Sequence, residues 1–195
     1  MTATSAPFGL EPVFHPSGNL RPIAWKDSID VSVTQSFFRG TPVQLTTAGL
    51  IVPFSDLTWD AAADDLIGIF QGVEYTDSSG QRKLRNNWVG PITGATQIVA
   101  YVWSDPATVF RVQANGSLAQ TSLGDQAQFA ALDTGNTVTG ISNVQISTTL
   151  VGAGNQGYVR IINIEPQIDN DWGDAFTIVQ VQIAAHQFVA SKVAI

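Results

Sequence analysis

Apolar and polar residues alternate with a period of two in several stretches of this chain of 195 residues. The alternation is clear in IDVSVTQ (29–35) and in FTIVQVQIAAHQF (176–188). Because successive side chains of a β-strand point to opposite faces, this period predicts strands with one buried face. In the second stretch the pattern slips by one position between Ile178 and Val179, which indicates either a bulge or burial of both faces.

Further strands are predicted where Val, Ile, Thr and aromatic residues are enriched. They are PVQLT (42–46), LIGIFQGVEY (66–75), TQIVAYVW (96–103), TVFRVQA (108–114), TVTGISNVQIS (137–147) and YVRIINIE (158–165). Short strands separated by turn-forming residues predict an all-β fold, either an antiparallel β-barrel or a jelly-roll-like sandwich. At most one short helix is expected, over SDLTWDAAADDL (55–66), because Ser55 or Asp56 can cap its start.

The first 25 residues differ from the rest, because residues 6–25 contain four prolines among large apolar side chains. Proline lacks a backbone N–H, so this segment is expected to be extended and to avoid the centre of a sheet. We therefore predict an extended N-terminal arm over residues 1–25 and a single β-barrel domain over residues 26–195. The arm either folds over its own barrel or lies on a neighbouring subunit. The side chains expected to anchor it are Phe8, Leu10, Pro12, Val13 and Phe14.

Charged residues are few, at 13% of the chain, and the formal net charge is −7. Binding to nucleic-acid phosphates requires clustered cations, and only Arg82, Lys83 and Arg85 form a small group, so direct nucleic-acid binding is not expected. The absence of cysteine excludes disulfides and thiolate metal sites. With neither a secretory signal nor a membrane-spanning apolar run in view, we expect a soluble protein made in a cytoplasm.

Sequence motifs for catalysis are weak. GAGNQG (152–157) matches the dinucleotide fingerprint, but a strand pattern follows it where the fingerprint requires a helix, so we interpret it as a Gly-rich hairpin loop. Serine-based catalysis needs a positioned base, and the two histidines are His15 in the Pro-rich segment and His186 in the last predicted strand. We therefore expect no enzymatic activity and no cofactor, with a hydrolase built on a carboxylate pair as an alternative.

Three carboxylates, Asp169, Asp171 and Asp174, lie close together before the last predicted strand. The calcium-loop template requires glycine at its sixth position and glutamate at its twelfth, and counted from Asp169 these positions hold Asp174 and Gln180. We predict a turn with positive φ at Gly173, which leads into a strand that closes the barrel. An irregular calcium site at these aspartates is the alternative, and no metal is otherwise expected.

Several segments resemble a family of tailed-bacteriophage structural proteins, the small capsid decoration or cement proteins. They are APFGLEPVFHPSGN (6–19), GIFQGVEYTDSSGQ (68–81), AYVWSDPATVFRVQANGS (100–117) and DNDWGDAFTIVQVQIAAHQF (169–188). The resemblance implies a β-barrel module that binds the outside of the capsid, commonly as a homotrimer, with a terminal arm on neighbouring coat subunits. The expected partners are therefore the major capsid protein and further copies of this chain. RKLRNNWVGPITGAT (82–96) matches the family least well.

A different binding function remains as an alternative. A jelly-roll-like carbohydrate-binding module of a phage virion would present exposed Trp59, Trp88 or Trp103 to a sugar, assisted by calcium at Asp169 and Asp171. Aromatic residues of β domains are more commonly part of the core. The expected function is therefore that of a non-enzymatic virion protein that stabilises the capsid from its exterior.

Overall fold

The computed structural model describes residues 4–54, 65–132 and 134–189. Sheet A contains, in spatial order, β1 (Glu11–Phe14), β10 (Val109–Gln113), β14 (Ile178–Ile183), β13 (Val159–Ile164), β11 (Gln126–Ala131) and β12 (Gln145–Leu150). Sheet B contains β2 (Ile23–Lys26), β9 (Thr96–Trp103), β6 (Gly68–Thr76), β4 (Pro42–Leu45) and β5 (Ile51–Pro53), and β7 (Arg82–Arg85) also pairs with β6. A third, two-stranded sheet joins β3 (Ser36–Phe38) and β8 (Asn87–Val89).

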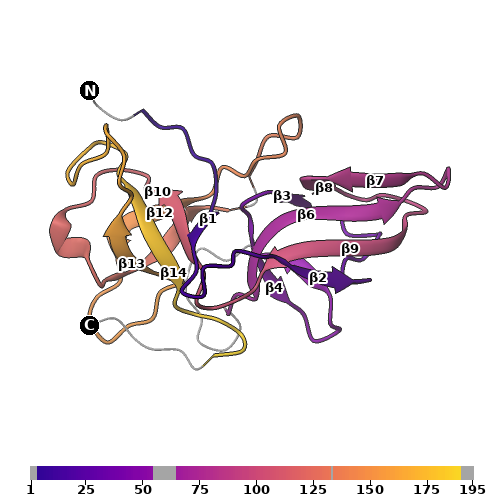
Figure 1. The fold of residues 1–195 in the computed structure, drawn as a ribbon, viewed down its shortest axis with the longest axis horizontal. Helices are drawn as coiled ribbons and strands as arrows, with labels where there is room; N and C mark the ends of the chain where they lie inside the picture. The colour runs from indigo at the N-terminus through magenta and orange to yellow at the C-terminus, as the bar shows by residue number, and fades with distance from the viewer. Residues whose placement is uncertain (1–3, 55–64, 133, 190–195) are drawn as a thin grey trace.

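The molecule is elongated, with sheet A in one half and sheet B in the other (Figure 1). All strand pairs are antiparallel, and the described residues contain one short 3-10 helix, Gln120–Ser122. The all-β prediction is confirmed in its sandwich-like form, whereas the barrel alternative is wrong. Strand β12, at one edge of sheet A, approaches the end of β10. Only an isolated bridge between Ala114 and Ile146 joins them, and the continuous strand pairing that would close a barrel is not formed there.

Each half has its own apolar core. In the first core, Phe54, Phe129 and Tyr158 pack ring against ring, with centroids 4.9 Å apart for Phe54–Tyr158 and 5.3 Å apart for Phe129–Tyr158. In the second core, Trp88 packs edge-on against Tyr75 at 5.4 Å. The described residues therefore pack around two apolar cores.

The predicted strands 42–46, 66–75, 96–103, 108–114 and 158–165 correspond to observed strands within a few residues. The prediction for 29–35 is wrong, because the Asp30 side chain accepts the backbone N–H of Ser32 at 2.8 Å and forms a turn. The last strand is shorter than predicted, since β14 covers only Ile178–Ile183. Residues 55–64, which make up most of the predicted helix, lie outside the described part of the chain.

The N-terminal segment is part of both sheets. Strand β1 forms the edge of sheet A beside β10, and β2 forms the edge of sheet B beside β9. The expected extended, non-central geometry is observed, but residues 11–14 and 23–26 are paired strands and do not form a separate arm. Residues 15–22, which begin with His15, connect β1 in sheet A to β2 in sheet B and so run from one half of the molecule to the other.

Candidate functional site

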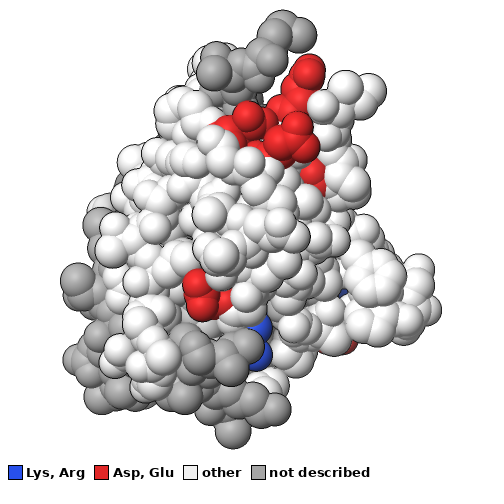
Figure 2. All heavy atoms as spheres, turned by 90° about the vertical axis from the view of Figure 1, so that its left-hand side faces the viewer, with Lys and Arg blue, Asp and Glu red and all other residues white. Residues whose placement is uncertain are grey.

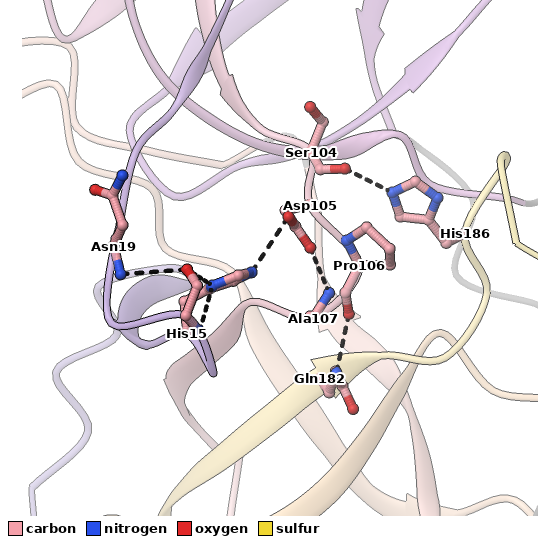
Figure 3. Close-up of polar contacts among 9 residues, drawn as sticks. His15, Asn19, Ser104, Asp105, Pro106, Ala107, Gln182 and His186 are labelled. Atoms are coloured by element: carbon pink, nitrogen blue, oxygen red, sulfur yellow. Dashed lines mark hydrogen bonds and ion pairs between the residues drawn. The ribbon is translucent and has the colours of Figure 1, made fainter.

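A polar cluster at the junction of the two halves contains both histidines of the chain. It is built around residues 104–108, the junction loop, which leads from β9 in sheet B to β10 in sheet A. His15 reaches the loop from the β1–β2 connection, and His186 reaches it from the segment after β14 (Figure 3). The sequence gives no sign of this meeting, because the contacting residues lie about 80 to 90 positions apart along the chain.

His15 links a serine and an aspartate. Its Nδ1 accepts the backbone N–H of Ser17 at 3.1 Å and lies 2.6 Å from Ser17 Oγ, while its Nε2 lies 3.2 Å from Asp105 Oδ2 (Figure 3). Because Nδ1 accepts a backbone N–H, it carries no proton, and the nitrogen that faces the carboxylate is Nε2.

Asp105 organises the junction loop. Its Oδ1 accepts the backbone N–H of Ala107 at 2.8 Å, and this bond, together with the contact to His15, holds the pKa of Asp105 below its usual value. The loop is further fixed by Gln182, whose Nε2 donates to the Pro106 carbonyl at 3.0 Å. These contacts tie the loop both to the N-terminal segment and to β14.

His186 is buried on the other side of the loop. Its Nδ1 accepts the backbone N–H of Phe188 at 3.1 Å, and its Nε2 lies 3.1 Å from the Ser104 carbonyl oxygen. Burial lowers the pKa of His186 below its ordinary value of 6.5, and the bond to Ser104 offsets only part of this effect. The ring is therefore neutral near pH 7, with its proton donated from Nε2 to Ser104.

The Ser17–His15–Asp105 chain contains the residue types of a serine nucleophile with its base. In this chain, however, His15 Nδ1 is already occupied by the Ser17 backbone N–H, and Ser17 is exposed within a tight turn in which the Gly18 N–H donates to the His15 carbonyl. A cavity of about 200 Å³ opens beside the junction loop and includes Pro106, Gln182 and His186, but Ser17 does not line it. The cluster is well suited to holding three segments together.

The carboxylates before β14 form a turn, as predicted, with Gly173 at φ 95°. Asp174 Oδ2 accepts the Asp171 backbone N–H at 2.8 Å. Acidic side chains gather at one end of this face of the molecule (Figure 2), yet within the described residues no three His, Asp or Glu side chains are grouped as metal ligands. The start of β14 is held by the neighbouring Asn170, whose side chain bonds the Ile178 backbone, and no sequence pattern distinguishes this residue from the aspartates around it.

The GAGNQG segment is a loop without a following helix, but it is not a hairpin. It connects β12 to β13, and these strands lie on opposite sides of β11. Gln126 Oε1 accepts the Gly157 backbone N–H at 2.7 Å and a bond from Gln156 Nε2 at 3.0 Å, which holds the loop across the end of β11. The dinucleotide interpretation therefore has no support in the local structure.

The predicted anchors of the arm contact the chain's own sheet A. Leu10 is 1% exposed and belongs to the first core, and Phe8 lies against the Arg111 guanidinium, which is 5.5 Å from the ring centroid. Pro12 and Val13 are half-buried in β1. Phe14 is the exposed member of the set, at 55%.

The tryptophans proposed as sugar platforms are not displayed. Trp88 is fully buried in the second core, and Trp103 is 9% exposed with its Nε1 bonded to Gln71 Oε1 at 2.9 Å. Trp59 lies outside the described residues. Neither Trp88 nor Trp103 therefore offers a face for stacking on a sugar ring.

Comparison with known proteins finds no matching family model, no similar curated protein and no similar solved structure. Among the residues described here, no helix is long and apolar enough to cross a bilayer. The function must therefore be argued from the chain itself.

Proposed function

We propose that this chain is a non-enzymatic structural protein of a tailed-phage virion, which binds the outer surface of the assembled capsid and stabilises the coat lattice. The resemblance of four long segments to capsid decoration proteins motivates the proposal. One structural observation carries it: large apolar side chains stand in solvent on turns of a weakly charged surface. Val138 is 93% exposed and Ile168 is 99% exposed, although only 13% of the residues are charged.

Such a surface is suited to protein contact. Exposed apolar groups on pre-ordered turns bury area on binding without a large loss of conformational entropy. A protein that binds the assembled lattice more strongly than free coat subunits stabilises the shell by mass action, and repeated sites on the lattice strengthen this effect. Homotrimer formation on the shell is part of the proposal.

The proposal is tested with shells assembled from the coat protein encoded with this chain. We expect the purified chain to co-sediment with expanded shells to a fixed stoichiometry and to raise the temperature at which they disassemble. Free coat subunits are the control, and they should bind more weakly. Absence of co-sedimentation, or an unchanged disassembly temperature at saturation, would refute the proposal.

Truncation of the N-terminal segment is not a suitable test of binding. Removing residues 1–20 would take Leu10 out of the first core and Glu11 away from Arg39 and Arg111. Such a variant would lose shell binding through loss of folding alone. Single substitutions of exposed side chains separate the two effects.

A further inference from the structure

Strand β2 is an open edge of sheet B. It pairs with β9 on one side, and no other strand of the described residues pairs with it on the other side (Figure 1). Three of its four residues are exposed, and Ile23 is 49% exposed. The edge of a sheet presents unpaired backbone N–H and C=O groups, to which a further strand can bind.

The pairing with β9 determines which backbone groups of β2 point outward. The Asp27 N–H donates to the Ile98 carbonyl at 2.7 Å, so these two residues are a hydrogen-bonded pair of the antiparallel ladder. Hydrogen-bonded pairs recur at every second residue of such a ladder, and the register of β2 against β9 is regular. The alternate residues, Ala24 and Lys26, therefore direct their N–H and C=O groups to the open edge.

The other edge strands of the two large sheets are less suited to pairing with a second copy of themselves. Strand β7 has the sequence RKLR, so two copies of it would bring like charges together. Strand β1 contains a bulge, and β5 has only three residues. An isolated bridge already joins β12 to the residue that follows β10. The regular open edge is therefore that of β2.

Exposed residues of opposite charge flank β2. Arg21 lies two positions before the strand, and Asp27 follows it directly. Asp27 Oδ2 lies 4.0 Å from Lys26 Nζ of the same chain, and the Asp27 side chain is 64% exposed, so its carboxylate is accessible to a further cation. When two antiparallel strands pair, the start of one lies beside the end of the other. Two copies of β2 can therefore match Arg21 with Asp27 at both ends.

We propose that β2 pairs with β2 of a second copy of this chain, antiparallel and two-fold symmetric about Ala24. The Ala24 N–H of each copy donates to the Ala24 carbonyl of the other. The Lys26 N–H of each copy donates to the Pro22 carbonyl of the other. Pro22 has no N–H, and this arrangement requires it only as an acceptor. The outward-pointing donors of the strand are thus all used.

Side chains favour the same register. Ile23 lies opposite Trp25 of the second copy in a non-hydrogen-bonded pair, where side chains approach most closely. Trp25 packs against the second core, so Ile23 adds to an apolar surface that already exists. Arg21 lies opposite Asp27 of the second copy. A shift by two residues in either direction keeps the backbone pattern but separates Arg21 from Asp27, so the charges select one register.

This contact belongs to the free chain and does not rest on the proposed capsid binding. A two-fold contact uses the same surface on both copies, so on a shell it would join neighbouring trimers and would not form a trimer. One short strand from each copy buries less area than a standard protein interface. We therefore expect a weak dimer, with a dissociation constant between about 10 µM and about 1 mM.

Sedimentation equilibrium of the purified chain without shells provides the test, over roughly a hundredfold range of concentration. Wild type should show a reversible monomer–dimer equilibrium. Ala24→Pro removes the central outward N–H from each copy but no hydrogen bond to β9, and an edge strand accepts proline at such a position. This variant should dimerise at least about tenfold more weakly and keep a melting temperature close to that of wild type.

A second set of variants tests the charges. Arg21→Glu places two carboxylates against each other at both ends and should weaken dimerisation roughly tenfold. The double variant Arg21→Glu/Asp27→Asn removes this repulsion and should recover part of the loss. Arg85→Glu, at an exposed position of β7, changes the net charge equally and is the control. It should leave the dissociation constant within about twofold of wild type.

Each outcome supports or overturns the dimer. A wild-type chain that stays monomeric at about 1 mM would refute it. Association that Ala24→Pro and Arg21→Glu both leave unchanged would show that the copies meet through another surface. Equal losses in Arg21→Glu and Arg85→Glu would refute the pairing of Arg21 with Asp27. If Ala24→Pro does not fold, the Arg21 variants decide. Because no shells are present, failure of the dimer leaves the proposed function standing, and failure of capsid binding leaves the dimer standing.

Discussion

Asn170 acts at the scale of a single side chain, because its buried amide takes the place of a strand partner. Its Oδ1 accepts the Ile178 backbone N–H, and its Nδ2 donates to the carbonyls of Ile178 and Glu165, all at 2.8 Å. The amide therefore pairs with the first residue of β14 as another strand would. Neither carboxylate nor aliphatic side chains supply both the donor and the acceptor that this position needs.

Replacing Asn170 should destabilise the fold. Asn170→Ala leaves buried backbone groups without partners, and we expect the free energy of unfolding to fall by roughly 2–4 kcal/mol. Asp169→Asn, at the exposed neighbouring position, is the control, with an expected change within about 0.5 kcal/mol. Chemical denaturation measures both, and equal changes in the two variants would show that the amide does not hold this register.

His186 should make stability depend on pH. Because burial lowers its folded-state pKa below 6.5, the unfolded chain takes up a proton at a higher pH than the folded chain. The neutral ring makes its full contribution to the free energy of unfolding above pH 6.5. This contribution is lost as the pH falls from 6.5 to the folded-state pKa. The free energy of unfolding, measured between about pH 8 and about pH 5, should show this decrease.

A substitution isolates the contribution of His186 to this decrease. In His186→Asn the side-chain carbonyl can accept the Phe188 N–H but cannot titrate, so the decrease attributable to the ring should be absent. Asp105 does not interfere with this measurement. Because its folded-state pKa is lowered, its contribution to the free energy of unfolding is lost only below pH 3.8. An unchanged pH dependence in the variant would contradict the assignment.

At the scale of elements, side-chain contacts add to the backbone pairing of β1 with β10 in holding residues 4–14 in place. Gln113 Oε1 accepts the Ala6 N–H at 2.9 Å, and Gln113 Nε2 donates to the Thr4 carbonyl at 3.2 Å. Glu11 contacts two guanidinium groups, Arg111 at 2.6 Å and Arg39 at 3.2 Å. Gly9 and Gly40 pack so closely that a Cβ on Gly9 would overlap the Gly40 carbonyl.

Two substitutions in this segment should differ strongly in effect. Leu10→Ala opens a cavity in the first core and should lower the free energy of unfolding by about 2–5 kcal/mol. Phe14→Ala, at the 55% exposed end of β1, should cost under about 1 kcal/mol. Thermal and chemical denaturation provide the comparison. If the two variants are equally stable, the segment is not part of the core in solution.

At the scale of the whole molecule, the two halves share side chains across their junction. Three residues that lie in strands of sheet B or next to them are buried in the first core, namely Leu66, Ile69 and Trp103. After β14, the Gln187 side chain accepts the Leu45 N–H at 2.8 Å and donates to the Leu45 carbonyl at 2.9 Å. Packing and hydrogen bonds therefore connect the halves in addition to the covalent chain.

This connection predicts cooperative unfolding. A cavity in the first core, made by Ile161→Ala, should reduce amide hydrogen-exchange protection in β9 of sheet B as well as in β14 of sheet A. The reciprocal variant, Val73→Ala in the second core, should reduce protection in β14. Loss of protection confined to the half that carries the substitution would show that the halves unfold independently.

Local signals in the sequence anticipated much of the fold. The strands around Ile69, Ala100 and Val112 follow from alternation and β-branched composition, and Gly173 follows from the turn chemistry around it. Strand β11, with the sequence QAQFAA, has low strand propensity and was not predicted, because it becomes a strand through pairing with β12 and β13. Val138 was assigned to a strand, but Asn136 and Gly140 bend the chain into a turn.

By itself the sequence determined the all-β class, the exclusion of the proline-rich segment from the sheet centres and the low proportion of charged residues. These properties depend on side chains and neighbours a few positions away. Only the tertiary structure decided that two sheets with separate cores form, that Leu10 is buried, and that His15 and His186 meet the same loop. Those outcomes depend on long-range pairing, where many registers satisfy the same local pattern and the packing of the whole chain selects one.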